Sequence, residues 1–118
     1  MNTNNIEPKV ANRRLSRRCK ARSTVKLECR KGWMGLGANV ATTLMDVSET
    51  GVRVVVSQEL VLRQDVEIIL AGYGMKQAIK RIGKVCWQLK LDDGKFCVGL
   101  AFEKRLPYAE WQSIASPS

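Results

Sequence analysis

Apolar and polar residues alternate with a period of two over much of the chain. From residue 23 onward, Val25, Leu27 and Cys29 are separated by charged residues, which is the pattern of a strand that buries one face. Further short segments are rich in β-branched residues and are separated by glycine or polar turn residues. The pattern predicts six strands, at residues 23–30, 39–45, 52–56, 66–70, 77–90 and 95–102.

The last third of the chain carries clear turn and helix signals. The Asp-Gly step at residues 93–94 predicts a hairpin turn, because type I′ turns need positive φ. Gly83, inside the preceding strand, predicts a bulge or a sharp bend. Residues 107–114 begin with proline and predict a short helix that packs Trp111 and Ile114 against the domain. The expected fold is therefore all-β, a six-stranded antiparallel β-barrel with a short C-terminal helix.

The chain divides into three parts. Residues 1–12 are polar, rich in asparagine and without periodicity, and we expect a disordered lead. Residues 13–22 form a basic, flexible N-terminal arm. Residues 23–116 form the barrel domain, and a length of 118 residues is typical of one domain.

The net charge of +9 is concentrated near the N-terminus. Residues 1–31 hold ten basic and two acidic residues, whereas residues 32–118 hold ten basic and nine acidic residues. Such a cluster attracts phosphate groups, nucleic acid or an acidic membrane surface. Taken alone, it is more typical of a solvated basic tail, and a nonspecific RNA-binding arm is a further interpretation.

The chain lacks the side chains that most catalytic and metal sites need. It contains no histidine, no nucleophile elbow and no Walker-type loop, and its four cysteines have no CxxC spacing. We therefore expect a protein that is not an enzyme and that holds no metal and no cofactor. Cys86 and Cys97 lie in apolar segments and are predicted to be buried free thiols.

The hydropathy pattern also bears on location. The sequence has no run of eighteen apolar residues, and residues 1–10 lack the apolar segment of a secretory signal. We expect a cytoplasmic protein with no membrane partner.

Two short motifs lie next to predicted strands. Arg14 to Arg18 fits RxxxR just before the first strand, and Asp46 to Gly51 fits DxSxxG between the second and third strands. Together they resemble the paired signature of the PilZ family. Residues 83–87 and 98–102 resemble later strands of that family, and the likeness spans roughly residues 13–114. The resemblance implies a PilZ-like split barrel whose ligand is the bacterial second messenger cyclic di-GMP.

The chemistry of this ligand suits the motif side chains. A guanidinium pairs bidentately with phosphate oxygens or with guanine O6 and N7. The resemblance therefore assigns Arg14 and Arg18 to phosphate and base contacts, and Asp46 and Ser48 to guanine recognition. Gly51 permits a close backbone approach. Gly99, expected near the barrel rim, is a further expected ligand-binding residue. In the alternative register of RxxxR, Arg13 and Arg17 take the place of Arg14 and Arg18.

Arg13 also bears on the number of bound ligands. In proteins similar to this one, an extra arginine before RxxxR accompanies two intercalated ligand molecules. Two molecules carry four phosphates, and a further fixed cation offsets their mutual repulsion. We therefore favour two ligands per domain.

The resemblance predicts a receptor or adaptor whose basic arm changes conformation on binding and signals to a separate protein. The rival is a small-barrel nucleic-acid binder, which would need stacking aromatic residues near the arm. A degenerate domain that contacts only proteins is a third interpretation. Asp46 to Gly51 can also serve as a plain turn, and Trp87 is predicted to lie in the core rather than to stack on a ligand. The sequence leaves open the partner, the controlled process and the oligomeric state.

Overall fold

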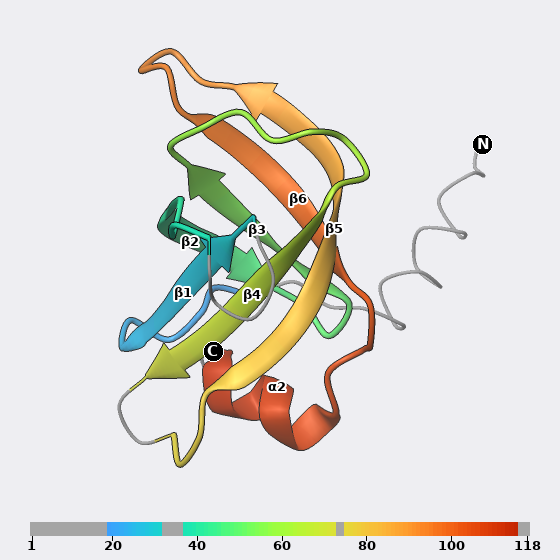
Figure 1. Cartoon of the computed structure of the whole chain (residues 1–118). Helices are drawn as coiled ribbons and strands as arrows, with labels where there is room; N and C mark the ends of the chain where they lie inside the picture. Colours follow the sequence, from blue (N-terminus) through green and yellow to red (C-terminus); the bar gives the residue numbers. More distant parts are fainter. Residues whose placement is uncertain (1–18, 32–36, 73–74, 116–118) are drawn as a thin grey trace, which may run out of the picture.

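The computed structural model describes residues 19–31, 37–72 and 75–115 (Figure 1). Six strands form one sheet in the order β1-β4-β5-β6-β3-β2, and all neighbours are antiparallel. The all-β fold with six antiparallel strands is confirmed. The elements are β1 (Val25–Arg30), β2 (Ala41–Val47), β3 (Gly51–Val56), β4 (Asp65–Gly72), β5 (Ile79–Lys90), β6 (Phe96–Phe102) and α2 (Tyr108–Ile114).

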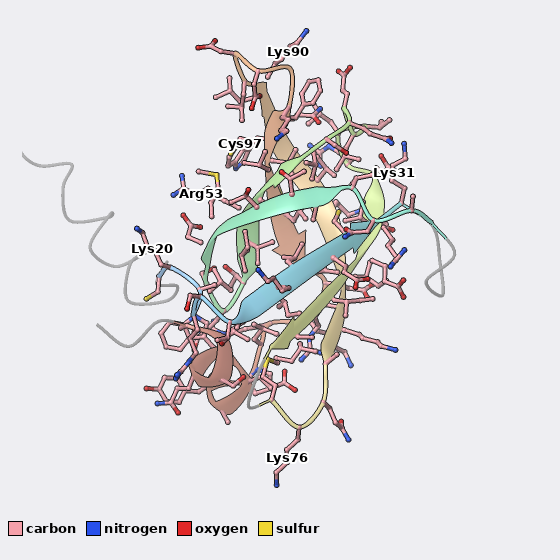
Figure 2. The ribbon with its side chains drawn as sticks, turned by 90° about the vertical axis from the view of Figure 1, so that its left-hand side faces the viewer. Lys20, Lys31, Arg53, Lys76, Lys90 and Cys97 are labelled. Carbon is pink, nitrogen blue, oxygen red and sulfur yellow. The ribbon has the colours of Figure 1, made fainter. Side chains whose placement is uncertain are left out.

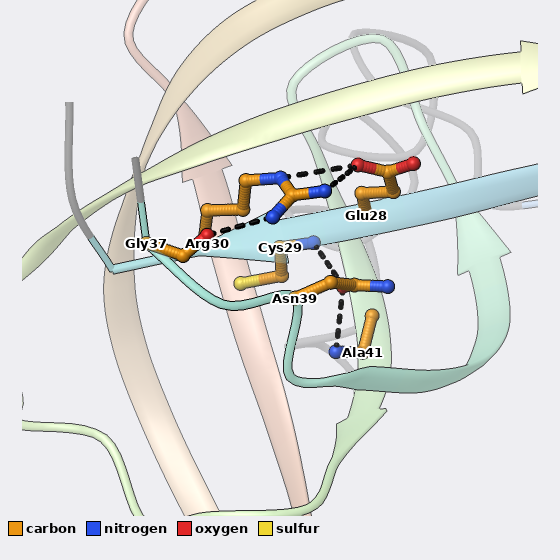
Figure 3. A network of polar contacts seen from close by, with 6 residues as sticks. All are labelled: Glu28, Cys29, Arg30, Gly37, Asn39 and Ala41. Atoms are coloured by element: carbon orange, nitrogen blue, oxygen red, sulfur yellow. Dashed lines mark hydrogen bonds and ion pairs between the residues drawn. The ribbon is translucent and has the colours of Figure 1, made fainter. Parts of the chain in front are cut away.

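The sheet curls until its two edge strands, β1 and β2, meet at one end. Arg30 forms an isolated bridge with Asn39, and the Val40 N–H donates to the Cys29 carbonyl at 2.9 Å. The Asn39 side-chain oxygen accepts from the N–H groups of Cys29 and Ala41, at 2.9 and 3.0 Å (Figure 3). These bonds join the edges and nearly close the barrel.

The barrel core follows from the alternation seen in the sequence. Every second residue of β3 points inward, and Val52, Val54 and Val56 have no exposed surface. β-branched side chains pack well on a pleated surface, so this strand contributes a continuous apolar row to the core. The largest fully buried side chains come from β2 to β6 and from the chain that follows the barrel: Ile68, Leu70, Leu100, Leu106, Ile114, Val47, Val52, Val54, Val56, Val66, Val85 and Val98.

The helix α2 lies across one end of the barrel (Figure 1). Pro107 occupies its N-cap position, where the missing N–H of proline removes no helical hydrogen bond. Ile114 is fully buried, and Trp111 packs against the core with part of its ring exposed. The predicted helix and its two packing residues are confirmed.

The last hairpin departs from the expected pattern at one residue. The irregularity predicted at Gly83 lies instead between Val85 and Trp87, where the register of β5 against β6 shifts. Val85 points inward, so Cys86 points outward, and the extra residue of the bulge leaves Trp87 exposed as well. The predictions of a buried Cys86 and a core Trp87 were therefore wrong.

The four cysteines occupy different environments, and all four are unpaired. Cys97 is buried, as predicted, whereas Cys86 is exposed. Cys29 has no exposed surface, and this burial raises the pKa of its thiol to about 11. Cys29 is thus protonated at neutral pH and acts as a small apolar core residue.

Replacing Ile114 with alanine tests whether α2 belongs to the cooperative fold. The substitution removes buried methyl groups and should lower the free energy of unfolding by about 2–5 kcal/mol. The control Gln112→Ala lies on the exposed side of the same helix and should change it by less than about 0.5 kcal/mol. Chemical denaturation followed by circular dichroism measures both, and equal small effects would show that α2 docks only loosely.

Candidate functional site

The two buried polar or charged residues of the described chain, Asp46 and Ser48, lie together at the turn between β2 and β3. Ser48 has no exposed surface, and its backbone N–H donates to the Gly51 carbonyl at 2.8 Å. Its hydroxyl accepts from the Thr50 N–H at 3.2 Å and lies 3.1 Å from the Thr50 hydroxyl. The turn role considered for this motif is therefore present. Ser48 thus stabilises the turn that follows Asp46.

Gly51 begins β3 at a point where β3 and β6 run unusually close. A Cβ added at Gly51 would collide with the carbonyl oxygen of Leu100 in β6. The strand packing alone thus accounts for a glycine at this position. The expected role of Gly51 in ligand binding stays a prediction.

Asp46 is joined to Arg53, which lies outside both sequence motifs. The two are register partners across β2 and β3, and the Arg53 Nε donates to Asp46 Oδ2 at 2.6 Å. The Arg53 Nη2 donates to the same oxygen. The hydrogen bond to Asp46 raises the pKa of the Arg53 guanidinium above its usual value. Desolvation by burial lowers this pKa, but by less than the hydrogen bond raises it. A signal was present in the sequence, because Arg53 is the one charged residue in an otherwise apolar strand.

Four register partners form a row across the outer face of the barrel. Trp87 of β5 pairs with Gly99 of β6, Gly99 with Arg53 of β3, and Arg53 with Asp46 of β2. Directly opposed residues of antiparallel strands share one face of the sheet. A Cβ at Gly99 would collide with the indole of Trp87, so the missing side chain makes room for that ring. Trp87 itself is 40% exposed. An aromatic ring, a guanidinium and a carboxylate are thus aligned over four strands.

The arginines of the predicted clamp, Arg13, Arg14, Arg17 and Arg18, lie outside the described residues. The first described residue is Cys19, the next residue after Arg18. Its N–H and carbonyl form two hydrogen bonds of 2.8 Å with the backbone of Val47. Val47 lies between Asp46 and Ser48 in the sequence, so the chain that follows the basic cluster is attached to the DxSxxG turn. Figure 2 shows Lys20 and Arg53 on the same side of the barrel.

The same segment also contacts the C-terminal helix. Ala21 forms an isolated bridge with Ala115, and the Arg22 N–H donates to the Ile114 carbonyl at 2.8 Å. The Arg22 Nη2 donates to the Gln112 carbonyl at 3.0 Å. Residues 19–22 therefore link the DxSxxG turn to the end of α2.

Residues 19–31, 37–72 and 75–115, which the structure describes, contain neither a cluster of metal ligands nor a membrane-spanning helix. No group of three or more cysteine, aspartate or glutamate side chains there is arranged to hold a metal ion. No helix in the same ranges has the length and apolar character needed to cross a membrane.

A nearly closed barrel of six antiparallel strands with a short C-terminal helix is the architecture of a small all-β domain. The chain matches the family model of the PilZ domain over residues 12–115. This match covers nearly the whole sequence, and the protein belongs to the PilZ domain family. PilZ domains are binding domains for cyclic di-GMP. No significant match to a curated protein is found.

Substitutions at the two glycines separate a backbone constraint from a side-chain constraint. Gly51→Ala places a methyl group against a strand backbone and should lower the free energy of unfolding by about 1–3 kcal/mol. Gly99→Ala meets the Trp87 ring, which can rotate outward, so we expect a smaller loss of stability together with a change in tryptophan emission. Urea denaturation and fluorescence spectra measure these effects. A larger loss for Gly99→Ala than for Gly51→Ala would contradict this assignment.

Proposed function

We propose that this protein is a receptor for cyclic di-GMP that binds the ligand on the outer face of β2, β3, β5 and β6. The observation that carries the proposal is the backbone pairing of Cys19 with Val47. Through this pairing the residue that follows the RxxxR motif is attached to the strand that holds Asp46. Two motifs that are distant in sequence therefore belong to one site.

Each part of the proposed site matches one part of the ligand. Asp46 offers carboxylate oxygens to the N–H donors of guanine, and Ser48 can exchange its turn bond for a bond to the base. Arg14 and Arg18 reach the phosphates and the O6 and N7 atoms of guanine. Trp87 supplies an exposed indole on which a base can stack, and Gly99 lets that ring approach the sheet.

We further propose that the ligand acts on the arm before Cys19. Residues 19–22 are hydrogen-bonded to Val47 and Ile114, so the change on binding belongs to the arginines that precede them. An arm that closes over the ligand is an order–disorder switch. Because the same segment contacts the end of α2, the helix and the closed arm together offer a surface to a separate protein, which is the proposed route of the signal.

The first test is a calorimetric titration with cyclic di-GMP at moderate salt. The wild-type protein should bind this ligand in preference to GTP, cyclic di-AMP and a short RNA. Arg18→Ala and Asp46→Ala should each lower the affinity by about tenfold or more, because each removes a hydrogen bond to a charged group. Lys76→Ala removes the same charge as Arg18→Ala at an exposed position distant in sequence, and it should leave the affinity unchanged.

The pattern of failures in this titration identifies which part of the proposal is wrong. Normal binding by Arg18→Ala with lost binding by Arg17→Ala would assign the clamp to Arg13 and Arg17. Normal binding by both arginine variants would refute the clamp. Binding of RNA that falls steeply with salt and ignores guanine would instead identify the nucleic-acid binder.

The number of ligands is tested in the same instrument. We expect two molecules of cyclic di-GMP per domain, because Arg13 adds a third arginine to Arg14 and Arg18 beside four phosphates. Arg13→Ala should reduce the ratio from about two to about one, since less of the phosphate repulsion is then offset. A ratio of one in the wild-type protein would refute the intercalated pair and leave the receptor function standing.

A further inference from the structure

The ion pair between Arg53 and Asp46 has a geometry that restricts the carboxylate. Two donors of the guanidinium, Nε and Nη2, converge on the single oxygen Oδ2. A guanidinium is a rigid, planar fork, so two bonds from it define a direction as well as a distance. The Asp46 side chain is 11% exposed and the Arg53 side chain is 42% exposed. The carboxylate is thus held from the solvent side by a residue of the neighbouring strand.

The contribution of this ion pair to folding stability does not explain why the two residues are paired. Ion pairs that are partly open to solvent contribute little to stability, because water screens the charges and ordering the side chains opposes the gain. Orientation is a different matter. A carboxylate that must accept hydrogen bonds from the edge of a base binds more tightly when its rotamer is already set.

The surroundings of Arg53 favour action through Asp46. Arg53 and Asp46 are direct register partners, so the ion pair needs no bend in either strand. The next residue along the row is Gly99, which has no side chain to compete for the guanidinium. Arg53 therefore lies between the Asp46 carboxylate and the Trp87 ring in the row of register partners.

We propose that Arg53 is a positioning residue that orients the Asp46 carboxylate and thereby determines the preference of the site for guanine. The inference rests on the proposed function, because it assumes that Asp46 faces a guanine base. It assigns Arg53 an indirect role, in which the arginine sets the angle of the acceptor and the acceptor selects the base.

The test compares cyclic di-GMP with its inosine analogue, which lacks the exocyclic 2-amino group. The wild-type protein should prefer cyclic di-GMP by about tenfold or more, because the analogue leaves a carboxylate hydrogen bond unmade. Arg53→Met keeps an unbranched apolar stem but removes the guanidinium fork, and the preference should fall below about threefold. Arg53→Lys keeps the charge without the fork and should give an intermediate preference.

A matched control exists in β1, which contributes no residue to the row. Arg30 of β1 donates through Nε and Nη2 to one oxygen of Glu28, at 3.1 and 2.7 Å, and so repeats the fork geometry away from the row (Figure 3). Arg30→Met should leave the preference for guanine unchanged. Thermal denaturation of each variant checks that the barrel remains folded.

A double-mutant cycle distinguishes the indirect role from a direct contact. If Arg53 acts through Asp46, then Arg53→Met introduced into Asp46→Asn should change the preference no further. If Arg53→Met weakens both ligands equally and keeps the wild-type preference, Arg53 contacts a phosphate and the inference is overturned. If the wild-type protein binds neither ligand, the proposed function itself fails, and that outcome is seen before any variant is made.

Discussion

The site depends on the pairing of β3 with β6. These strands are distant in sequence, and their six-residue antiparallel ladder joins the β2–β3 hairpin to the β5–β6 hairpin. Without it, Asp46 and Arg53 would lie on one hairpin, and Gly99 and Trp87 on the other. The ladder also explains Gly51, because the strands approach so closely there that a side chain would meet the backbone of β6. The β3–β6 ladder therefore determines both the need for glycine at position 51 and the alignment of the proposed site residues.

The polar or charged residues that the described part of the chain buries as a whole lie in the DxSxxG motif. Asp46 and Ser48 are the buried polar or charged residues within the described ranges, and each has hydrogen-bond partners in the protein. A buried polar group without partners would destabilise the fold. The turn is therefore held by hydrogen bonds of the protein itself. Under the proposed function, a ligand must offer bonds at least as good as those it replaces. This requirement favours a ligand with several fixed donors and acceptors, as guanine has.

The sequence was sufficient for the features that depend on local pattern. The alternation of Val25, Leu27 and Cys29, the Asp-Gly turn and the proline before α2 each specify their element through short-range chemistry, and all six strands and the helix were predicted. Trp87 was misplaced because one extra residue in a bulge moves a side chain to the other face, and no composition marks that residue. Arg53 was missed because its partner is determined by strand register. The arginines of the clamp stay a prediction.

The contacts of residues 19–22 determine how the proposed site is connected to the rest of the fold. This segment is hydrogen-bonded to Val47 at one end and to Ile114 near the other, so it joins the recognition turn to the terminal helix. On the opposite side of the turn, Arg105 is ion-paired with Glu49, and the Leu106 N–H donates to the Glu49 carbonyl at 2.8 Å. The segment before α2 is therefore hydrogen-bonded to Glu49, and the end of α2 is connected to Val47 through residues 19–22. Glu49 and Val47 both belong to the DxSxxG motif. Both connections include backbone hydrogen bonds, from Cys19 to Val47 and from Leu106 to Glu49. Under the proposed function, α2 is for this reason the element that the closed arm and the turn both adjoin, and the surface they form together includes it.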